Sequence, residues 1–492
     1  MPKRRQPASL KQLCILYIAS NFKRIWWKEF VENFGDTQVL HVLGPFDTLP
    51  SGVIEDIINT LEKKGILIGK YLQILFTDRL RHLYLGGNVI TNQLVKTLAL
   101  KSQKLESLHL KFNKISNNLL MNVVENLPAV KELDLSCTKC NDAMMKIISL
   151  NCPQLYRLSI SSCPDVSDDG IHFLCAGKTP KLQYVSLVDS NTTEQSVYQL
   201  LRAYPGLKEV DMNININGVA QVIEEDILCG RTESKYGIQK LNLEMSVPFT
   251  TSTSLMAEHC PCVSDVTCYG VITADILKKV ASFKSMKKLK LFHTNEKMGR
   301  HDLKGFVKFL QIVGNQLTEL SISNTGLMPL NEIGMFCLNL KHLLIICEED
   351  IFQQDTAAVD DLCLNSRSFT KLETVNLIAL DNLILASEQQ VTFLLYQAEN
   401  LQKLFFEKIK GITSTGLQAA YQQHGFKHLK YLGLTNCPAV DDISVFKMLL
   451  ETENELTHLS LMSCFNITQA HNDELTACLK KGKNWDIAYK WE

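Results

Sequence analysis

A short phrase of apolar and polar positions, apolar-x-x-apolar-x-apolar, recurs along most of the chain and first appears at Leu80, Leu83 and Leu85. The first four copies begin at residues 80, 105, 130 and 155, a step of 25 residues, and later steps reach about 31. The phrase occurs fifteen times, with first residues Leu80, Leu105, Val130, Leu155, Leu182, Leu207, Ile238, Val263, Met286, Leu317, Leu340, Leu372, Leu401, Leu429 and Leu456.

Alternate apolar residues within the phrase predict a short strand with one buried face, and the apolar segment that follows predicts a helical return to the next strand. A single unit leaves one face uncovered, so stability requires the units to stack. We therefore expect an α/β fold, a solenoid of about 15 repeats with strands on its inner face and helices on its outer face. The period is that of leucine-rich repeats.

Several copies of the phrase run on to a cysteine, as at Cys163, Cys437 and Cys464. This extension resembles the cysteine-containing subclass of leucine-rich repeats, which is common in substrate receptors of ubiquitin ligases. The resemblance covers roughly residues 80–480 and implies an architecture without naming a partner.

The N-terminal 79 residues lack the phrase but predict two amphipathic helices. Ser9 is placed to cap the first, with Gln12 three residues later. That helix sets Leu10, Cys14 and Ile18 one turn apart, with Leu13 and Tyr17 beside them. The second begins at Leu49 and Pro50, and its apolar face consists of Val53, Ile54, Ile57, Ile58 and Leu61.

The spacing Ser9-Leu10-x-x-x-Cys14-x-x-x-Ile18 resembles the box through which substrate receptors bind Elongin C. Leu49-Pro50-x-x-Val53, with Ile57, resembles the companion box that selects cullin-2. Together they form a von Hippel-Lindau box, and ahead of leucine-rich repeats they resemble the Zyg and Zer family of receptors. The resemblance implies adaptor contacts by Ser9, Leu10, Leu13, Cys14, Tyr17, Ile18, Leu49, Pro50, Val53 and Ile57.

The same resemblance implies a non-catalytic subunit that joins Elongin B/C and cullin-2 to a protein substrate of unknown identity. Two alternatives remain open: the helices only cap the first repeats, or the Leu49-Pro50 helix is an F-box-like site for Skp1 and cullin-1. A leucine-rich scaffold without a ligase role is a further alternative. The chain departs from the family because it ends at Glu492 without an armadillo-like half, so the family's glycine-degron specificity is not expected.

The third, fifth and seventh residues of each phrase should face solvent on the concave side. Early repeats place mainly acidic residues there, including Glu132, Asp134, Glu209 and Asp211. From the eighth repeat on, lysines and large apolar residues occupy these positions, which is typical of binding surfaces. The candidate substrate-binding residues are Tyr269, Lys288, Lys290, Phe292, Leu344, Ile346, Ile378 and Phe405. An equal alternative is that inserts near residues 224–237, 292–304 and 347–367 cover them.

Composition and charge indicate which partners, compartments and kinds of chemistry to expect. A formal charge of −1 argues against nucleic acid as a partner. We find no signal peptide and no apolar run long enough to span a membrane, so 16 cysteines indicate reduced thiols in the cytoplasm or nucleus. Cys137 and Cys140 form a lone pair, and no catalytic or cofactor motif occurs, so we predict no metal, cofactor or enzyme activity. The predicted domains are an adaptor-binding and capping region, 1–79, and the repeats, 80–492.

Overall fold

The structure is a computed structural model that describes residues 9–34, 44–87, 92–177, 179–213, 216–231, 233, 235–244, 252–292, 300–323, 330–347, 368–380, 388–451, 455–481 and 487–492. The chain forms two compact units, which we describe separately: an N-terminal unit, residues 6–240, and a C-terminal unit, which begins at Leu241. This division falls within the repeats, whereas the boundary predicted at residue 79 separates the first helices from the repeats.

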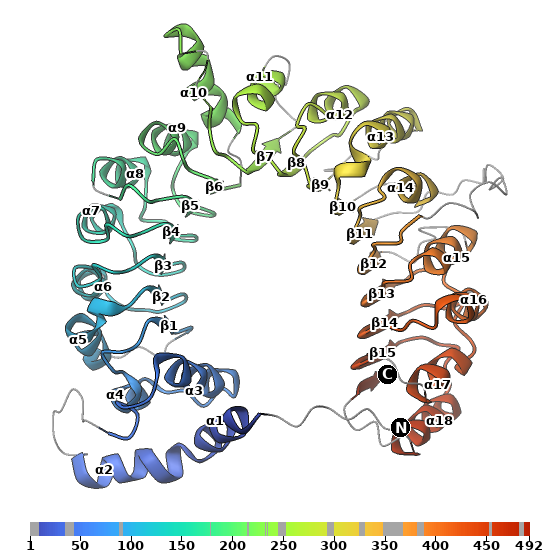
Figure 1. Cartoon of the computed structure of the whole chain (residues 1–492), viewed down its shortest axis with the longest axis horizontal. Helices are drawn as coiled ribbons and strands as arrows, with labels where there is room; N and C mark the ends of the chain where they lie inside the picture. Colours follow the sequence, from blue (N-terminus) through green and yellow to red (C-terminus); the bar gives the residue numbers. More distant parts are fainter. Residues whose placement is uncertain are drawn as a thin grey trace. The chain divides into compact units, whose positions relative to one another are not determined.

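The N-terminal unit alternates helices and three-residue strands (Figure 1). Four α-helices precede the first strand: α1 (Leu10–Asn21), which runs through a π-helical segment (Lys23–Trp27) into α2 (Lys28–Phe34), then α3 (Ser51–Lys63) and α4 (Leu72–Leu75). The repeats follow as β1 (His82–Tyr84), α5 (Asn92–Lys101), β2 (Ser107–His109), α6 (Asn117–Val124), β3 (Glu132–Asp134), α7 (Asp142–Asn151), β4 (Arg157–Ser159), α8 (Asp168–Cys175), β5 (Tyr184–Ser186), α9 (Glu194–Ala203), β6 (Glu209–Asp211) and α10 (Ile216–Leu228).

The C-terminal unit has longer strands, mostly of five or six residues. Its elements are β7 (Lys240–Glu244, beginning at the unit boundary), α11 (Ser252–His259), β8 (Asp265–Tyr269), α12 (Ala274–Val280), β9 (Lys288–Phe292), α13 (Arg300–Val313), β10 (Glu319–Ser323), α14 (Leu330–Phe336), β11 (His342–Cys347), β12 (Thr374–Ala379), α15 (Glu388–Gln397), β13 (Lys403–Glu407), α16 (Ser414–His424), β14 (Tyr431–Thr435), α17 (Ser444–Glu451), β15 (His458–Met462), α18 (Gln469–Lys481) and β16 (Ala488–Trp491).

Each of the fifteen phrases forms one strand, β1 to β15, and the predicted leucine-rich-repeat fold is confirmed. The strands pair in sequence order into a six-stranded and a ten-stranded sheet, with parallel pairing wherever a register is resolved. Phrase positions pair with the same positions in the next repeat, so Leu83 lies opposite Leu108 and Leu343 opposite Val375. The apolar phrase residues are buried between sheet and helices, which leaves one face of each sheet open.

The last strand was not predicted. β16 pairs with β15, although its segment lacks the spaced leucines of the phrase. Within the described residues, no helix is long and apolar enough to span a membrane.

Helix α3 covers the free edge of β1. The Glu55 carboxylate accepts hydrogen bonds from the backbone N–H groups of Arg81 at 3.2 Å and His82 at 3.1 Å, and Glu62 accepts one from Gly86 at 3.1 Å. An exposed strand edge invites pairing with other chains, and these carboxylates occupy its donors instead. These contacts are the ones that a helix at the end of the sheet would make as a cap.

Candidate functional site

The first helix starts as the sequence predicts. The Ser9 hydroxyl accepts a hydrogen bond from the backbone N–H of Gln12 at 3.2 Å, and the Gln12 side chain accepts one from the N–H of Ser9 at 3.0 Å. This reciprocal capping box satisfies two N–H groups that have no partner within the helix. The capping box therefore fixes where α1 begins.

One face of α1 is buried in the N-terminal unit. Ile15, Ala19 and Phe22 lie three and four positions apart, and all three are buried. The Phe22 ring lies 4.8 Å from the Tyr71 ring and 5.8 Å from the Phe46 ring, centroid to centroid. Burial in this cluster raises the pKa of the Tyr71 hydroxyl. These contacts hold α1 in place without using its opposite face.

The opposite face of α1 carries an exposed apolar stripe, which we call the ridge: Leu10, Leu13, Leu16 and Tyr17. Leu10 is 78% exposed, Tyr17 59% and Leu13 52%. The thiol-bearing Cys14 beside them is also exposed, and Ile18 is half-buried at the margin. The side chains expected to contact Elongin C are thus outside the core. Leu16 was not among the predicted residues.

The side chains of the second box are distributed differently. Pro50 is exposed, Leu49 and Val53 are half-buried, and Ile57 is fully buried together with Ile54, Ile58 and Leu61. Ile57 belongs to the core that fixes α3, so a partner cannot contact it in this conformation. An ion pair between Lys11 and Asp56 at 2.7 Å joins α1 to α3, which places both boxes on one packed pair of helices.

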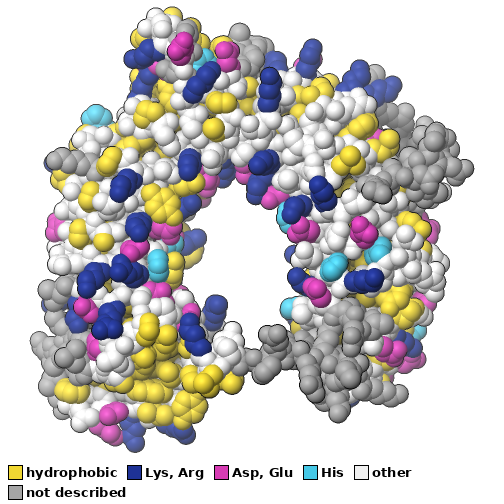
Figure 2. All heavy atoms as spheres, viewed as in Figure 1, with side chains coloured by type: hydrophobic (Ala, Val, Ile, Leu, Met, Phe, Trp, Pro, Cys, Tyr) yellow, Lys and Arg dark blue, Asp and Glu magenta, His cyan; other side chains and the backbone are white. Residues whose placement is uncertain are grey.

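An open depression of about 630 Å³ follows the ridge along the same helical run. Its apolar floor includes Trp27 and Val31, and its rim carries the cations Lys23, Arg24 and Lys28. π-Helical turns often occur at functional sites, and the Lys23–Trp27 segment contributes three of these five residues. Figure 2 shows hydrophobic side chains gathered over the N-terminal helices at the lower left. No sequence pattern that we identified predicts the π-helical turn.

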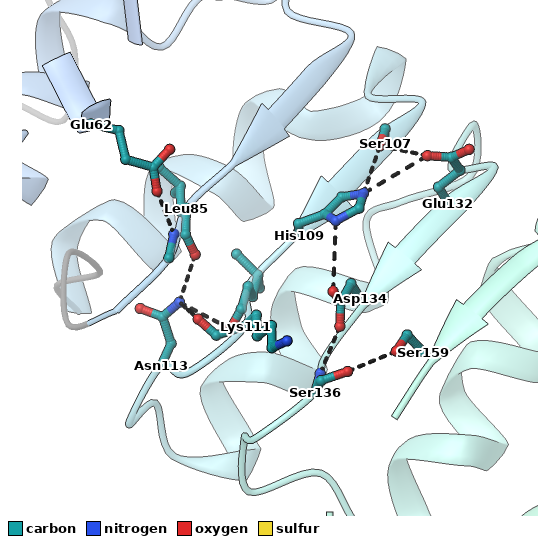
Figure 3. A network of polar contacts seen from close by, with 12 residues as sticks. Glu62, Leu85, Ser107, His109, Lys111, Asn113, Glu132, Asp134, Ser136 and Ser159 are labelled. Carbon is teal, nitrogen blue, oxygen red and sulfur yellow. Dashed lines mark hydrogen bonds and ion pairs between the residues drawn. The ribbon is translucent and has the colours of Figure 1, made fainter. Parts of the chain in front are cut away.

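The open face of the six-stranded sheet is polar and internally paired (Figure 3). His109 on β2 lies 3.8 Å from a Glu132 carboxylate oxygen and 3.7 Å from one of Asp134. A hydrogen bond from the Tyr156 hydroxyl lowers the pKa of Glu132. Burial raises the pKa of Asp134, but contacts with His109 and Ser136 outweigh it, so that pKa also lies below its usual value.

These residues line a shallow cavity of about 290 Å³, which extends to Arg157, Tyr184, Glu209 and Asp211. Lys240 pairs with Glu209 at 3.2 Å and Asp211 at 2.7 Å, and those ion pairs raise its pKa despite partial burial. The acidic zone predicted from the sequence is therefore present, and Lys240 of β7 forms ion pairs with two of its carboxylates, Glu209 and Asp211.

The open face of the ten-stranded sheet carries the predicted substrate-binding residues. Parallel register brings Tyr269 opposite Phe292, and their rings stack at 5.3 Å with 13° between planes. All eight predicted side chains are half-buried or exposed, namely Tyr269, Lys288, Lys290, Phe292, Leu344, Ile346, Ile378 and Phe405. Much of the two later inserts, residues 293–299 and 348–367, lies outside the described residues, so the alternative of loop cover is not tested.

Among the described residues, no group of three or more potential metal ligands gathers. Cys140, Cys163, Cys437 and Cys464 are buried, and the last two thiols donate weakly to backbone carbonyls of the preceding repeat. They serve as small packing residues.

Comparison with known proteins finds no matching family model and no matching curated protein. Among solved structures, the chain is similar to one in the yeast Rad7 and Elc1 complex, with 16% identity, a TM-score of 0.41 and coverage of 94% of this chain and 95% of that one. A leucine-rich-repeat protein of Leptospira interrogans, LIC12759, is 14% identical, with a TM-score of 0.39 and coverage of 92% of this chain and 97% of that one. An internalin of Listeria monocytogenes, inlF, is 16% identical, with a TM-score of 0.37 and coverage of 79% of this chain and 97% of that one. These similarities are too low to assign a function.

Proposed function

We propose that this chain is the substrate-recognition subunit of a cullin-2 and Elongin B/C ubiquitin ligase. The observation that carries the proposal is the two-sided apolar character of α1. Ile15, Ala19 and Phe22 fix one side, while Leu10 and Tyr17 stand exposed on the other. A helix that is apolar all round is normally buried on all sides, so the ridge is explained by a second polypeptide that covers it.

Docking would follow the helix-in-groove mode, in which anchors one turn apart enter an apolar groove. Burial of the Leu10 side chain contributes about 2 kcal/mol by its area. Cys14 is small enough to allow close approach beside it, and Ile18 closes the far end. For the cullin, the accessible contacts are Leu49, Pro50 and Val53, since Ile57 is in the core.

The proposed role is non-catalytic and belongs to the cytoplasm or nucleus. The repeats hold a target protein, and the ligase assembly brings it near the loaded conjugating enzyme. The gain in rate is one of proximity, because transfer then occurs within one assembly.

The test is co-purification with Elongin B/C after co-expression. Wild type should retain Elongin C, and the double variant Leu10→Ala with Cys14→Phe should lose it. Both side chains are exposed, so the melting temperature should shift by no more than a few degrees. Retention of Elongin C by the double variant would remove the ligase proposal.

The chain offers a matched control. Leu228, at the end of α10, is 85% exposed and lies outside the N-terminal helices. Leu228→Ala removes the same side chain from an exposed position and should leave Elongin C capture unchanged. Equal loss in both variants would indicate nonspecific apolar adhesion.

A second candidate, a leucine-rich scaffold whose N-terminal helices act only as a cap, is favoured by the contacts of α3 with β1. It predicts no capture of Elongin C. A third outcome, capture of Skp1 through the Leu49-Pro50 helix, would support the F-box-like alternative.

A further inference from the structure

Among the described residues, one lysine on the open face of the ten-stranded sheet makes no ion pair. Lys288 forms an ion pair with Glu319 at 2.6 Å, whereas Lys290 on the same strand makes no ion pair among the described residues. Lys290 lies in register between Thr267 and Ser321, two neutral side chains. An ammonium group in this setting is complementary to an anion supplied by another molecule.

An apolar surface begins directly beside this cation. Two residues after Lys290 on β9, Phe292 faces the same side of the sheet and stacks on Tyr269 of β8. In the same row across the sheet, Ile346 of β11 lies in register with Ile378 of β12. Ser323 separates the two apolar groups and leaves room between them. The surface therefore combines one positive charge on β9 with large apolar side chains on β8, β9, β11 and β12.

A buried acceptor without a donor lies in the row that contains Lys290. This row runs from Lys290 through Ser321, Leu344 and Asn376 to Phe405. The Asn376 amide oxygen is inaccessible to solvent and accepts no hydrogen bond from the described residues. An unsatisfied buried acceptor is unfavourable, and because water cannot reach this oxygen, a bound peptide cannot reach it either in this conformation.

The row ends at a close contact. A Cβ on Gly433 would lie 2.8 Å from Phe405 Cδ2, so the glycine lets the Phe405 ring lie against the backbone of β14. Phe405 is thereby held in place at one end of the row, while Lys290 marks the other.

We propose that this face binds an extended peptide segment with an acidic side chain at Lys290 and apolar side chains over Leu344, Ile346 and Ile378. This inference rests on the proposed receptor function and names its substrate class. Neighbouring strands are about 4.8 Å apart, so Lys290 and Leu344, two strands apart, are separated by about 10 Å, which an extended chain spans in about three residues.

The test uses the purified full chain and fluorescein-labelled nonapeptides that contain one glutamate and one leucine, two to five residues apart, in a Gly/Ser background. Fluorescence anisotropy should show the tightest binding at a separation of about three. Lysine in place of the glutamate should weaken binding roughly tenfold or more, the scale of a charge-assisted hydrogen bond.

Three variants connect the preference to named residues. Lys290→Glu should reverse the preference towards the lysine-containing peptide, while Lys308→Glu, an exposed lysine on α13, should preserve it. Asn376→Leu removes an acceptor that the peptide cannot reach, so the protein should unfold at an equal or higher temperature and keep the preference.

Peptides that fail to bind wild type, or a preference that Lys290→Glu leaves unchanged, would overturn the inference. Either result leaves Elongin C capture untouched, so it is distinguishable from failure of the proposed function. Conversely, peptide binding without Elongin C capture would support this inference and leave a peptide-binding scaffold.

Discussion

The two sheets use one repeat phrase but present different open faces. In the N-terminal unit, three-residue strands display carboxylates, serines, His109 and Arg157, many of them paired with one another. In the C-terminal unit, longer strands display aromatic and aliphatic side chains and a lysine that makes no ion pair among the described residues. The inward positions are apolar in both. The phrase therefore specifies the fold through inward residues and leaves the outward residues free to differ.

The largest expected effect separates inward from outward positions on one strand. Leu404 on β13 is fully buried, and its neighbour Phe405 points to the open face. Leu404→Ala should lower the free energy of unfolding by about 2–5 kcal/mol. Phe405→Ala should lower it by about 1 kcal/mol or less. Urea denaturation measures both, and equal losses would contradict the assignment of faces.

A smaller effect is expected where the open face of the C-terminal unit is closely packed. Gly433→Ala places a methyl group within 2.8 Å of both Phe405 and Tyr431. The rings must move, so we expect a loss of about 1–3 kcal/mol in the same assay. The double variant Gly433→Ala with Phe405→Ala should recover part of it. No recovery would show that the strain lies elsewhere.

The polar face of the N-terminal unit should make stability depend on acid. The folded-state pKa values of Glu132 and Asp134 lie below their ordinary values of 4.5 and 3.8. Their contribution is therefore complete above about pH 4.5 and is lost as the pH falls through the lowered values. The variant Glu132→Gln with Asp134→Asn should be less stable than wild type at pH 6. Between pH 6 and pH 3 it should lose less stability than wild type does.

The control for this effect is on the other sheet. Glu407 lies on the open face of β13, in register with Ile378 and Thr435. Glu407→Gln should keep the full acid-induced fall in the urea midpoint. The same fall in the Glu132 and Asp134 variant would remove the proposed asymmetry between the faces.

The smallest expected effect is on stability at the ridge. Leu10 is 78% exposed and contributes little to the core. Leu10→Ala should therefore change the free energy of unfolding of the isolated chain, measured by urea denaturation, by less than about 0.5 kcal/mol. A loss of several kcal/mol would mean that the ridge is a packing surface in the free chain.

Local sequence patterns predicted most strands and the start of the first helix. Strands β1 to β15 were predicted because the phrase, as in Leu429, Leu432 and Leu434, marks the buried positions of a strand from local sequence alone. The capping box at Ser9 depends only on residues three apart. The strand β16 was not predicted because, among the described residues near its start, only Ile487 is apolar and buried, and no leucine spacing follows.

Non-local features were not predictable. Ile57 matches the cullin-2 box in sequence, yet its burial depends on how α3 packs against the first repeat. The carboxylates of Glu55 and Glu62 accept hydrogen bonds from residues more than 20 positions away. Likewise, the difference between Lys288 and Lys290 appears only when Glu319 is placed on the adjacent strand.

The central claim is that another polypeptide covers the ridge, and labelling of Cys14 with a maleimide tests it most directly. Cys14, Cys229 and Cys262 are all exposed in the isolated chain, so all three should react. Saturating Elongin B/C should protect Cys14 and leave Cys229 and Cys262 reactive, as read by peptide mass spectrometry. Unchanged labelling of Cys14 in the presence of Elongin B/C would contradict the account.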